Sequence, residues 1–350
     1  MTIDTFIMEN KQKDREILSD YNLDLELFQM MGLEILDIVP FRNVFRITTQ
    51  KGMFSLKRVI YSKEEMDFIM FATEHLKNNG FQNMLEYETK DDGSLFYEYD
   101  GEKYYLTKWI DGRELDYLNP IDLKSATLLL SEFHKASQGF HPPVIPDSRN
   151  LLGKWPESFK ERIYEMNEMK FRALLKRGRT QFDKIYLEFV DMCLEDARRA
   201  LKLLLDSPYE ELVNKAKEKK GFIHHDYAHH NLMQSFDGKL YILDFDYCAV
   251  DIKIHDLGSL IIRNMKKTTW DIDKALNIIE IYDKETPISN DELRVLVPFF
   301  LFPQDFWQIS RQYYIERKDW GDRDYLDKMN TKSQYTISRR QFIEEFEKRI

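Results

Sequence analysis

Three polar residues in the second half of the chain have the types and the spacing for work on a phosphate group. Asp226 is followed five positions later by Asn231, and the apolar run 241–243 leads directly into Asp244. A carboxylate can orient a hydroxyl group and take its proton, whereas an amide oxygen and a second carboxylate are ligands that suit Mg²⁺. The set predicts metal-assisted phosphoryl transfer to a hydroxyl, with Asp226 as the base and Asn231 and Asp244 as metal ligands.

The neighbours of these residues give the order of a kinase catalytic loop. Such a loop reads H-x-D-x-x-x-x-N and is followed by an Asp at the end of a strand. Here His224 stands two positions before Asp226, and Asp-Gly at 237–238 predicts a hairpin turn before the strand that delivers Asp244. The alternative is that Asp226 and Asn231 only cap turns and that Asp244 only ends a strand.

Four histidines in the same stretch make a zinc site the rival interpretation. They are His224, His225, His229 and His230. The first and third, and the second and fourth, are five residues apart, one more than places two ligands on one face of a helix. No third ligand motif accompanies them. We therefore expect His224 to brace the loop backbone and the metal to be Mg²⁺ rather than zinc.

A phosphate-binding site also needs a cation, and a predicted strand supplies Lys57. On the next predicted helix, 63–79, steps of about 100° per residue place Glu65 within an apolar stripe. A carboxylate in such a stripe needs a buried cation as its partner, so we expect Glu65 to pair with Lys57. Glu64 and Glu74 are the other candidates for this partner, and an exposed, solvated strand lysine is the alternative for Lys57.

The composition narrows the classes of protein that could carry this chemistry. The chain has 350 residues and a formal net charge of −10, from 51 Lys and Arg against 61 Asp and Glu. An acidic protein is a poor candidate for non-specific nucleic-acid binding, which depends on neutralising phosphates, so we expect no nucleic-acid partner. Hydrophobic residues make up 43%, enough for a sizeable core and too many for a disordered chain.

The sequence also indicates where the chain is made. Cys193 and Cys248 are 55 residues apart and lie in no metal-binding spacing, which favours two reduced thiols. Residues 1–18 lack a basic start followed by an apolar run, so we expect no signal peptide. The longest apolar stretch, 295–302, has eight residues, whereas a bilayer span needs about 20. We therefore expect synthesis in a reducing cytoplasm and no membrane partner.

The chain changes character once, near Gly112. Before it, residues 33–60 and 84–110 are rich in β-branched and aromatic residues, with hairpin turns predicted at 91–94 and 100–102. After it, long helical patterns dominate. They cover residues 121–137, 156–175, 180–205, 209–219 and the chain from 256 onward, with short strands over 221–250.

This change predicts two lobes. Residues 1–109 would form a small, β-rich, nucleotide-binding lobe. Residues 110–350 would form a larger helical lobe that carries the catalytic loop and the acceptor site.

The whole chain resembles the aminoglycoside phosphotransferase and choline kinase superfamily, whose members have a protein-kinase-like fold. Residues 104–113 resemble the hinge between the lobes, whose backbone holds adenine, so Lys108, Trp109 and Ile110 are expected nucleotide contacts. Asp256 resembles the acidic residue that anchors the catalytic loop. The resemblance implies an α+β, two-lobe fold that uses ATP, or another nucleoside triphosphate, and Mg²⁺.

Within that superfamily the chain is similar to the CotS-like family of bacterial spore coat proteins. The motifs that carry the likeness lie at 133–140, 152–156, 269–271 and 302–307. The resemblance implies a protein of spore-forming bacteria that is deposited in the spore coat, with other coat proteins as partners.

Two features depart from the protein-kinase pattern. The loop 39–45, which should cover the phosphates, contains no glycine. Asp246 replaces the glycine of Asp-Phe-Gly, and an acidic residue there is usual in the small-molecule branch of the superfamily. We predict Mg-ATP-dependent phosphotransfer to a hydroxyl of a small molecule or a sugar. The alternative, which the loop without glycine favours, is an inactive kinase-fold protein with a structural or binding role in the coat.

Overall fold

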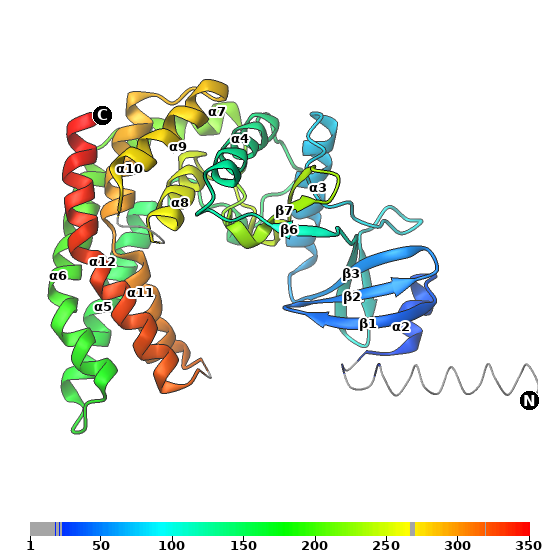
Figure 1. Cartoon of the computed structure of the whole chain (residues 1–350), viewed down its shortest axis with the longest axis horizontal. Helices are drawn as coiled ribbons and strands as arrows, with labels where there is room; N and C mark the ends of the chain where they lie inside the picture. The colour runs from blue at the N-terminus through cyan, green and yellow to red at the C-terminus, as the bar shows by residue number, and fades with distance from the viewer. Residues whose placement is uncertain (1–17, 19–20, 22, 267–269, 319) are drawn as a thin grey trace, which may run out of the picture. The chain divides into compact units, whose positions relative to one another are not determined.

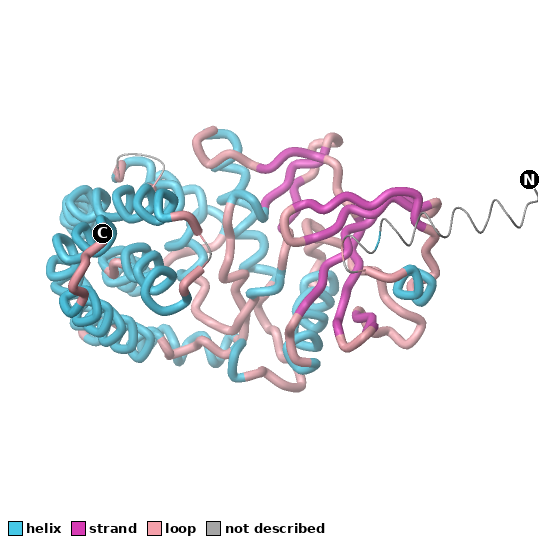
Figure 2. The backbone as a smooth tube through the Cα atoms, turned by 90° about the horizontal axis from the view of Figure 1, so that it is seen from below, coloured by secondary structure: helices cyan, strands magenta, loops and turns pink. Residues whose placement is uncertain are grey.

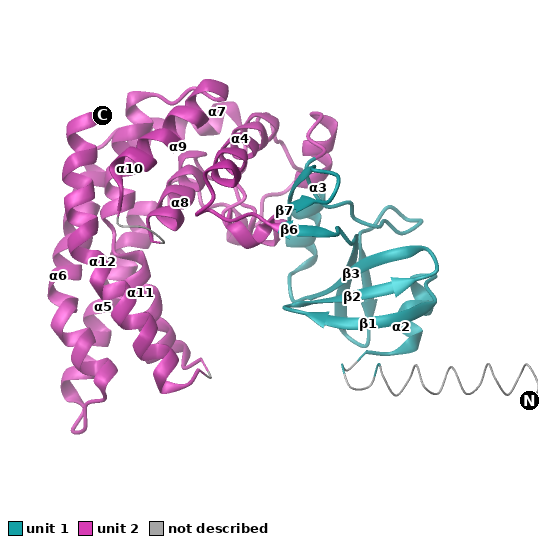
Figure 3. Ribbon diagram, viewed as in Figure 1, with its two compact units in different colours: residues 1–70, 83–113, 233–244 teal, residues 71–82, 114–232, 245–350 magenta. Residues whose placement is uncertain are grey.

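The chain folds into two compact units whose segments alternate along the sequence. A computed structural model describes residues 18, 21, 23–266, 270–318 and 320–350 (Figure 1). Figure 3 colours the units: unit 1 comprises residues 1–70, 83–113 and 233–244, and unit 2 comprises residues 71–82, 114–232 and 245–350. The segment 1–17, where no signal peptide is expected, lies outside the described residues. The lobe limits at residues 109 and 110 stay a prediction.

Unit 1 is built on a five-stranded antiparallel sheet in the order β1-β2-β3-β5-β4. Its strands are β1 (Ile35–Phe41), β2 (Val44–Thr49), β3 (Gly52–Val59), β4 (Phe96–Tyr99) and β5 (Glu102–Lys108). One face of the sheet packs its alternate apolar residues, among them Ile47, Leu56 and Leu106, against Phe28 of the short helix α2 (Leu25–Met30). The period-two alternation of these strands therefore separates a buried face from a second face, which carries Lys57.

A tight turn fixes the register of β4 against β5. Asp100 and Gly101 join β4 to β5 with φ angles of 50° and 76°, as the prediction of a hairpin at 100–102 requires. The predicted turn at 91–94 is present, with the Lys90 N–H donating to the Ser94 carbonyl over 2.8 Å. It joins no two strands, however, because the described residues before it form only single bridges, as Tyr87 does with Thr107. The segment is therefore a loop that lies along β5.

A second, three-stranded sheet has the order β6-β7-β8. Its strands are β6 (Gly112–Glu114), β7 (Leu232–Ser235) and β8 (Leu240–Ile242). Gly238, with φ 88°, closes the predicted hairpin between β7 and β8. A side chain at Gly112 would lie 2.2 Å from the backbone oxygen of Gln234, so only glycine lets these strands approach. The sheet delivers the chain to Asp244, two residues after β8.

The helices form almost all of the remaining ordered structure, as the cyan segments of Figure 2 show. They are α3 (Lys63–Asn78), α4 (Pro120–Ala136), α5 (Trp155–Leu175), α6 (Gln181–Leu205), α7 (Tyr209–Lys219), α8 (Ile254–Met265), α9 (Ile272–Glu285), α10 (Asn290–Leu301), α11 (Gln304–Arg311) and α12 (Asp322–Arg349). From α3 to α7 their bounds agree with the prediction within one residue at each end. Thr180 starts α6 with a reciprocal capping box to Asp183, which explains the agreement at the start of that helix.

Two predictions about the environment of the chain can be compared with the fold. Cys193 and Cys248 are both buried and form no disulfide. In the described part of the chain, no helix combines the length and the apolarity that a membrane span requires.

Candidate functional site

Unit 1 brings together two of the predicted site residues that are far apart in the sequence. The Lys57 ammonium on β3 donates a hydrogen bond to Oδ1 of Asp244 over 2.9 Å, although 187 positions separate the two residues. The lysine is buried, at 7% exposure, so its charge needs a partner of this kind. Asp244 has a left-handed backbone, with φ 58°, a conformation that non-glycine residues adopt mainly where the surrounding structure imposes it.

Glu65 lies in the first turn of α3 and is half-buried. Its Oε2 accepts a hydrogen bond from the Ser62 N–H over 3.1 Å, while its own N–H donates to the Ser62 hydroxyl over 3.3 Å. This reciprocal pair caps the start of the helix. Glu65 therefore has a structural role as well, and its pairing with Lys57 stays a prediction.

The predicted hinge residues differ in what their backbone can offer a nucleotide. The Lys108 N–H donates to the Glu86 carbonyl and the Trp109 N–H to the Met53 carbonyl, each over 3.0 Å. In the described part of the chain, the N–H of Ile110 has no hydrogen-bond partner. Of the three residues, Ile110 is therefore the one with a donor left for a purine base.

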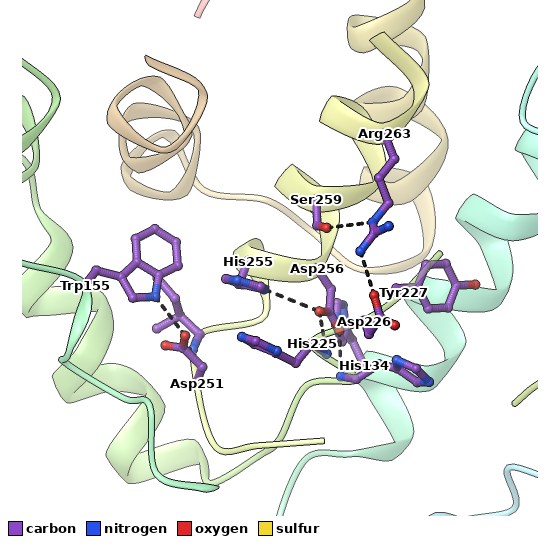
Figure 4. A network of polar contacts seen from close by, with 12 residues as sticks. His134, Trp155, His225, Asp226, Tyr227, Asp251, His255, Asp256, Ser259 and Arg263 are labelled. Carbon is purple, nitrogen blue, oxygen red and sulfur yellow. Dashed lines mark hydrogen bonds and ion pairs between the residues drawn. The ribbon is translucent and has the colours of Figure 1, made fainter. Parts of the chain in front are cut away.

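Unit 2 holds the other predicted site residues, in the loop before β7. The side-chain amide of Asn231 donates to the Asp226 carboxylate over 3.1 Å and to its backbone oxygen over 2.9 Å. The five-residue spacing read from the sequence thus closes the loop on itself. Arg263 of α8 donates from Nη2 to Oδ1 of Asp226 over 2.6 Å, so a cation holds the other carboxylate oxygen (Figure 4).

Asp256, at the start of α8, anchors this loop, as the superfamily resemblance implied. It is fully buried and accepts hydrogen bonds from the backbone N–H groups of His224 and His225, over 2.7 and 2.9 Å (Figure 4). Nε2 of His134 lies 3.3 Å from its Oδ2. Burial alone would raise the pKa of Asp256, but the bonds and charge interactions with His134 and His255 outweigh it and hold the pKa well below its usual range. The anchor therefore stays ionised.

The cluster of histidines packs around this anchor. The rings of His225 and His255 are stacked, with centroids 4.7 Å apart and an interplanar angle of 9°. Burial, together with the neighbouring His255, lowers the pKa of His225 to about 3, so this ring is neutral. Among the described residues, no three His, Cys, Asp or Glu side chains are grouped to hold a metal ion. The geometry thus gives the zinc interpretation no support.

Arg263 is the functional candidate that sequence reasoning missed. It lies seven residues after Asp256 on α8, which is two helical turns and therefore the same face of the helix. Because Asp256 was already identified as the loop anchor, this spacing was a usable signal. A second missed contact is the bond from Nε1 of Trp155 to Asp251, over 2.7 Å. Trp155 is buried at 7% exposure, which favours a core role for this residue.

The fold is that of the kinase-like phosphotransferases, as predicted. An aminoglycoside phosphotransferase from Alicyclobacillus acidocaldarius subsp. acidocaldarius DSM 446 has a similar structure, with a TM-score of 0.77, 20% identity, and coverage of 90% of this chain and 92% of that one. Spectinomycin phosphotransferase APH(9)-Ia, solved with ADP and spectinomycin, is similar with a TM-score of 0.60 and 14% identity, covering 88% of this chain and 93% of that one.

Comparison of the sequence with known families identifies the family of this chain. The chain belongs to the family described as "Spore coat putative kinase YutH", whose model matches residues 25–346. Spore coat protein S of Bacillus subtilis (strain 168) is 26% identical over 320 residues, which cover 91% of this chain and 90% of that protein. The resemblance to spore coat proteins predicted from the motifs is therefore confirmed.

Proposed function

We propose that this protein is a spore coat-associated phosphotransferase that moves a phosphoryl group from Mg-ATP to a hydroxyl of a small molecule or a sugar. The observation that carries the proposal is the ion pair between Lys57 and Asp244, 2.9 Å long and largely withdrawn from water. A buried ammonium held on a carboxylate at the end of a strand is the arrangement that positions nucleotide phosphates and their metal ion.

Each of the two predicted metal ligands, taken by itself, has a donor that fits Mg²⁺. Asp244 offers carboxylate oxygens, and Asn231 directs its amide nitrogen at Asp226, which leaves its Oδ1 without a hydrogen-bond partner among the described residues. Hard oxygen ligands of this kind suit Mg²⁺ better than zinc. When bound, the metal would neutralise charge on the phosphates. Lys57, with Glu65, would hold the phosphates, and Ile110 would contact the base.

Asp226 is the proposed catalytic base. Asn231 and Arg263 each engage one of its carboxylate oxygens, and every such oxygen has two lone pairs, so one lone pair remains on each. The carboxylate is thus held in one orientation and can still accept a proton. In the proposed reaction it orients the acceptor hydroxyl and takes its proton as the phosphoryl group arrives.

The relatives support the substrate class and the location. Spectinomycin phosphotransferase was solved with ADP and a small-molecule acceptor, and a Plasmodium vivax ethanolamine kinase shares the fold with a TM-score of 0.56. The name of spore coat protein S supports a place in the spore coat, with other coat proteins as partners. We propose both features for this chain on that basis.

Asp244→Asn tests the nucleotide site. Truncating one partner of a paired charge costs about 2 kcal/mol or more, so calorimetry should show Mg-ATP affinity reduced roughly 30-fold or further. Asp237→Asn, in the exposed turn between β7 and β8, is the control and should bind as the parent does. A parent protein that gives no heat with millimolar Mg-ATP would refute the proposed function.

A second candidate function is a binding or structural role in the coat without catalysis. The observation in its favour is the β1–β2 hairpin, whose two-residue turn, Arg42 and Asn43, contains no glycine. A backbone without glycine approaches phosphate less closely. Under this alternative neither Asp244→Asn nor the parent would show nucleotide-dependent stabilisation.

Arg263→Gln tests the support of the catalytic base. Without the guanidinium, the Asp226 carboxylate loses one of the two groups that orient it, so release of ADP from Mg-ATP should slow on the order of 10-fold to 10²-fold. Affinity for Mg-ATP should not change, because Arg263 bonds to Ser259 and Asp226, neither of which is a proposed nucleotide or metal ligand. Arg323→Gln, whose side chain is 94% exposed, controls for the loss of a positive charge. Unchanged turnover in Arg263→Gln would show that the ion pair is not needed.

A further inference from the structure

The sheet face that carries Lys57 also carries a second, half-buried cation, Arg46. Arg46 of β2 stands directly opposite Ser55 of β3, and Lys57 is two residues further along β3. Residues two apart on a strand share a face, so Arg46, Ser55 and Lys57 lie on the same face. Diagonal neighbours of this kind are about 7–8 Å apart at their Cα atoms, which both long side chains can span.

Arg46 has donors but no acceptor. In the part of the chain that the structure describes, its side chain makes no hydrogen bond and no ion pair, and its Nε is buried without a partner. The guanidinium carbon lies 5.9 Å from the ring centroid of Trp109, the hinge residue. That ring meets Phe41 of β1 edge-on at 5.5 Å. A planar cation fixed on an aromatic ring, with a buried N–H left over, is prepared for an anionic oxygen.

The neighbouring hairpin explains why such a cation would be needed. In protein kinases a glycine-rich loop covers the phosphates and can bring backbone N–H groups close to them. Here Phe41 pairs with Val44 across a two-residue turn, and Arg42 in that turn has a left-handed φ of 57°. This tight hairpin without glycine offers few backbone donors, so the charge on the phosphates must be met by side chains.

We propose that Arg46 is a nucleotide-binding residue that contacts the phosphate oxygens of the nucleoside triphosphate. Its side chain lies on the Trp109 ring and binds the phosphates, as backbone N–H groups of a glycine-rich loop do in protein kinases. The proposal rests on the proposed function, because it names a further contact of the same nucleotide. It differs from a merely structural role, in which Arg46 would only hold the ring of Trp109.

The test compares ligands that differ in their number of phosphates. Calorimetry with Mg-ATP, Mg-ADP and adenosine should show Arg46→Gln weakening ATP binding about tenfold to 100-fold, the worth of one hydrogen bond to a charged group. ADP binding should weaken less, and adenosine binding less than twofold. Arg58→Gln is the matched control, since Arg58 is on β3 next to Lys57, points to the opposite face and pairs with Glu102 in solvent.

Each other outcome overturns the proposal. Equal losses for ATP and adenosine would mean that Arg46 only supports Trp109. A parent protein that does not bind ATP would remove the proposed function and this contact together. If Arg46→Gln does not fold, labelling of the parent protein with phenylglyoxal tests the contact between Arg46 and the phosphates instead. ATP, but not adenosine, should protect Arg46 from modification, and equal labelling with and without ATP would refute the contact.

Discussion

Asp226→Asn is expected to slow phosphoryl transfer by a factor on the order of 10²–10⁴, the usual contribution of a positioned acid–base group. The amide has the shape of the carboxylate but cannot take the proton of the acceptor. Affinity for Mg-ATP should stay within about twofold, because Asp226 is proposed to act on the acceptor. Release of ADP from Mg-ATP, with water as the acceptor, measures the rate, and calorimetry measures the affinity.

The environment of Asp226 sets the stability expected of this variant. The substitution removes the negative charge that Arg263 binds and turns an amide nitrogen toward either Arg263 or Asn231, which both donate. The side chains of Asp226 and Arg263 are 28% and 32% exposed, so solvent screens the pair and the loss should be at most about 1 kcal/mol. Thermal unfolding should therefore show a folded protein. Asp206→Asn, at the exposed end of α6, is the control for rate and stability. Equal ADP release by Asp226→Asn and the parent would exclude the proposed base.

Local patterns in the sequence were sufficient to predict most of the fold. The helices from α3 to α7 were predicted within a residue because apolar periodicity acts over a few positions, and α4 and α6 also have side-chain caps at Asn119 and Thr180. The loop 84–95 was mistaken for part of a β-rich region because it contains Tyr87 and Thr89 and leads into β4. Whether such a segment joins a sheet depends on the strand beside it, here β5, and propensity does not report that pairing.

In the candidate site, too, contacts within one loop could be predicted from the sequence, whereas contacts between distant segments could not. Spacing within one loop suggested that Asp226 and Asn231 work together, and their hydrogen bond fits that prediction. The ion pair of Lys57 with Asp244 and that of Arg263 with Asp226 join positions 187 and 37 residues apart, and no periodicity connects them. Motif order could suggest the first pair. For the second, the sequence places Arg263 on the helix face of the anchor Asp256, but its pairing with Asp226 depends on the orientation of α8, which is fixed by the packing of the helix.

Asp256→Ala is expected to have the largest effect on stability. The carboxylate is fully buried and accepts from the N–H groups of His224 and His225 and from His134. Alanine would leave these buried donors unpaired, and an unpaired buried donor costs about 1–3 kcal/mol. Removing one partner of a buried charged network costs about 3–5 kcal/mol, so we expect a loss of that size in the free energy of unfolding. Guanidinium unfolding followed by circular dichroism measures it, with the exposed Asp273→Ala as the control.

The loss should depend on pH in a defined direction. Because the pKa of Asp256 in the folded protein lies below that of an unfolded chain, about 3.9, its contribution is complete above that pH and disappears as the pH falls through the folded-state value. The unfolding curves of the parent and Asp256→Ala should thus differ most at neutral pH and approach each other in acid. Hydrogen exchange should also speed up at the amides of His224 and His225, since Asp256 is their acceptor. If Asp256→Ala loses activity while those two amides stay protected, contacts other than Asp256 hold the loop that carries Asp226. The assignment of Asp256 as the anchor then fails.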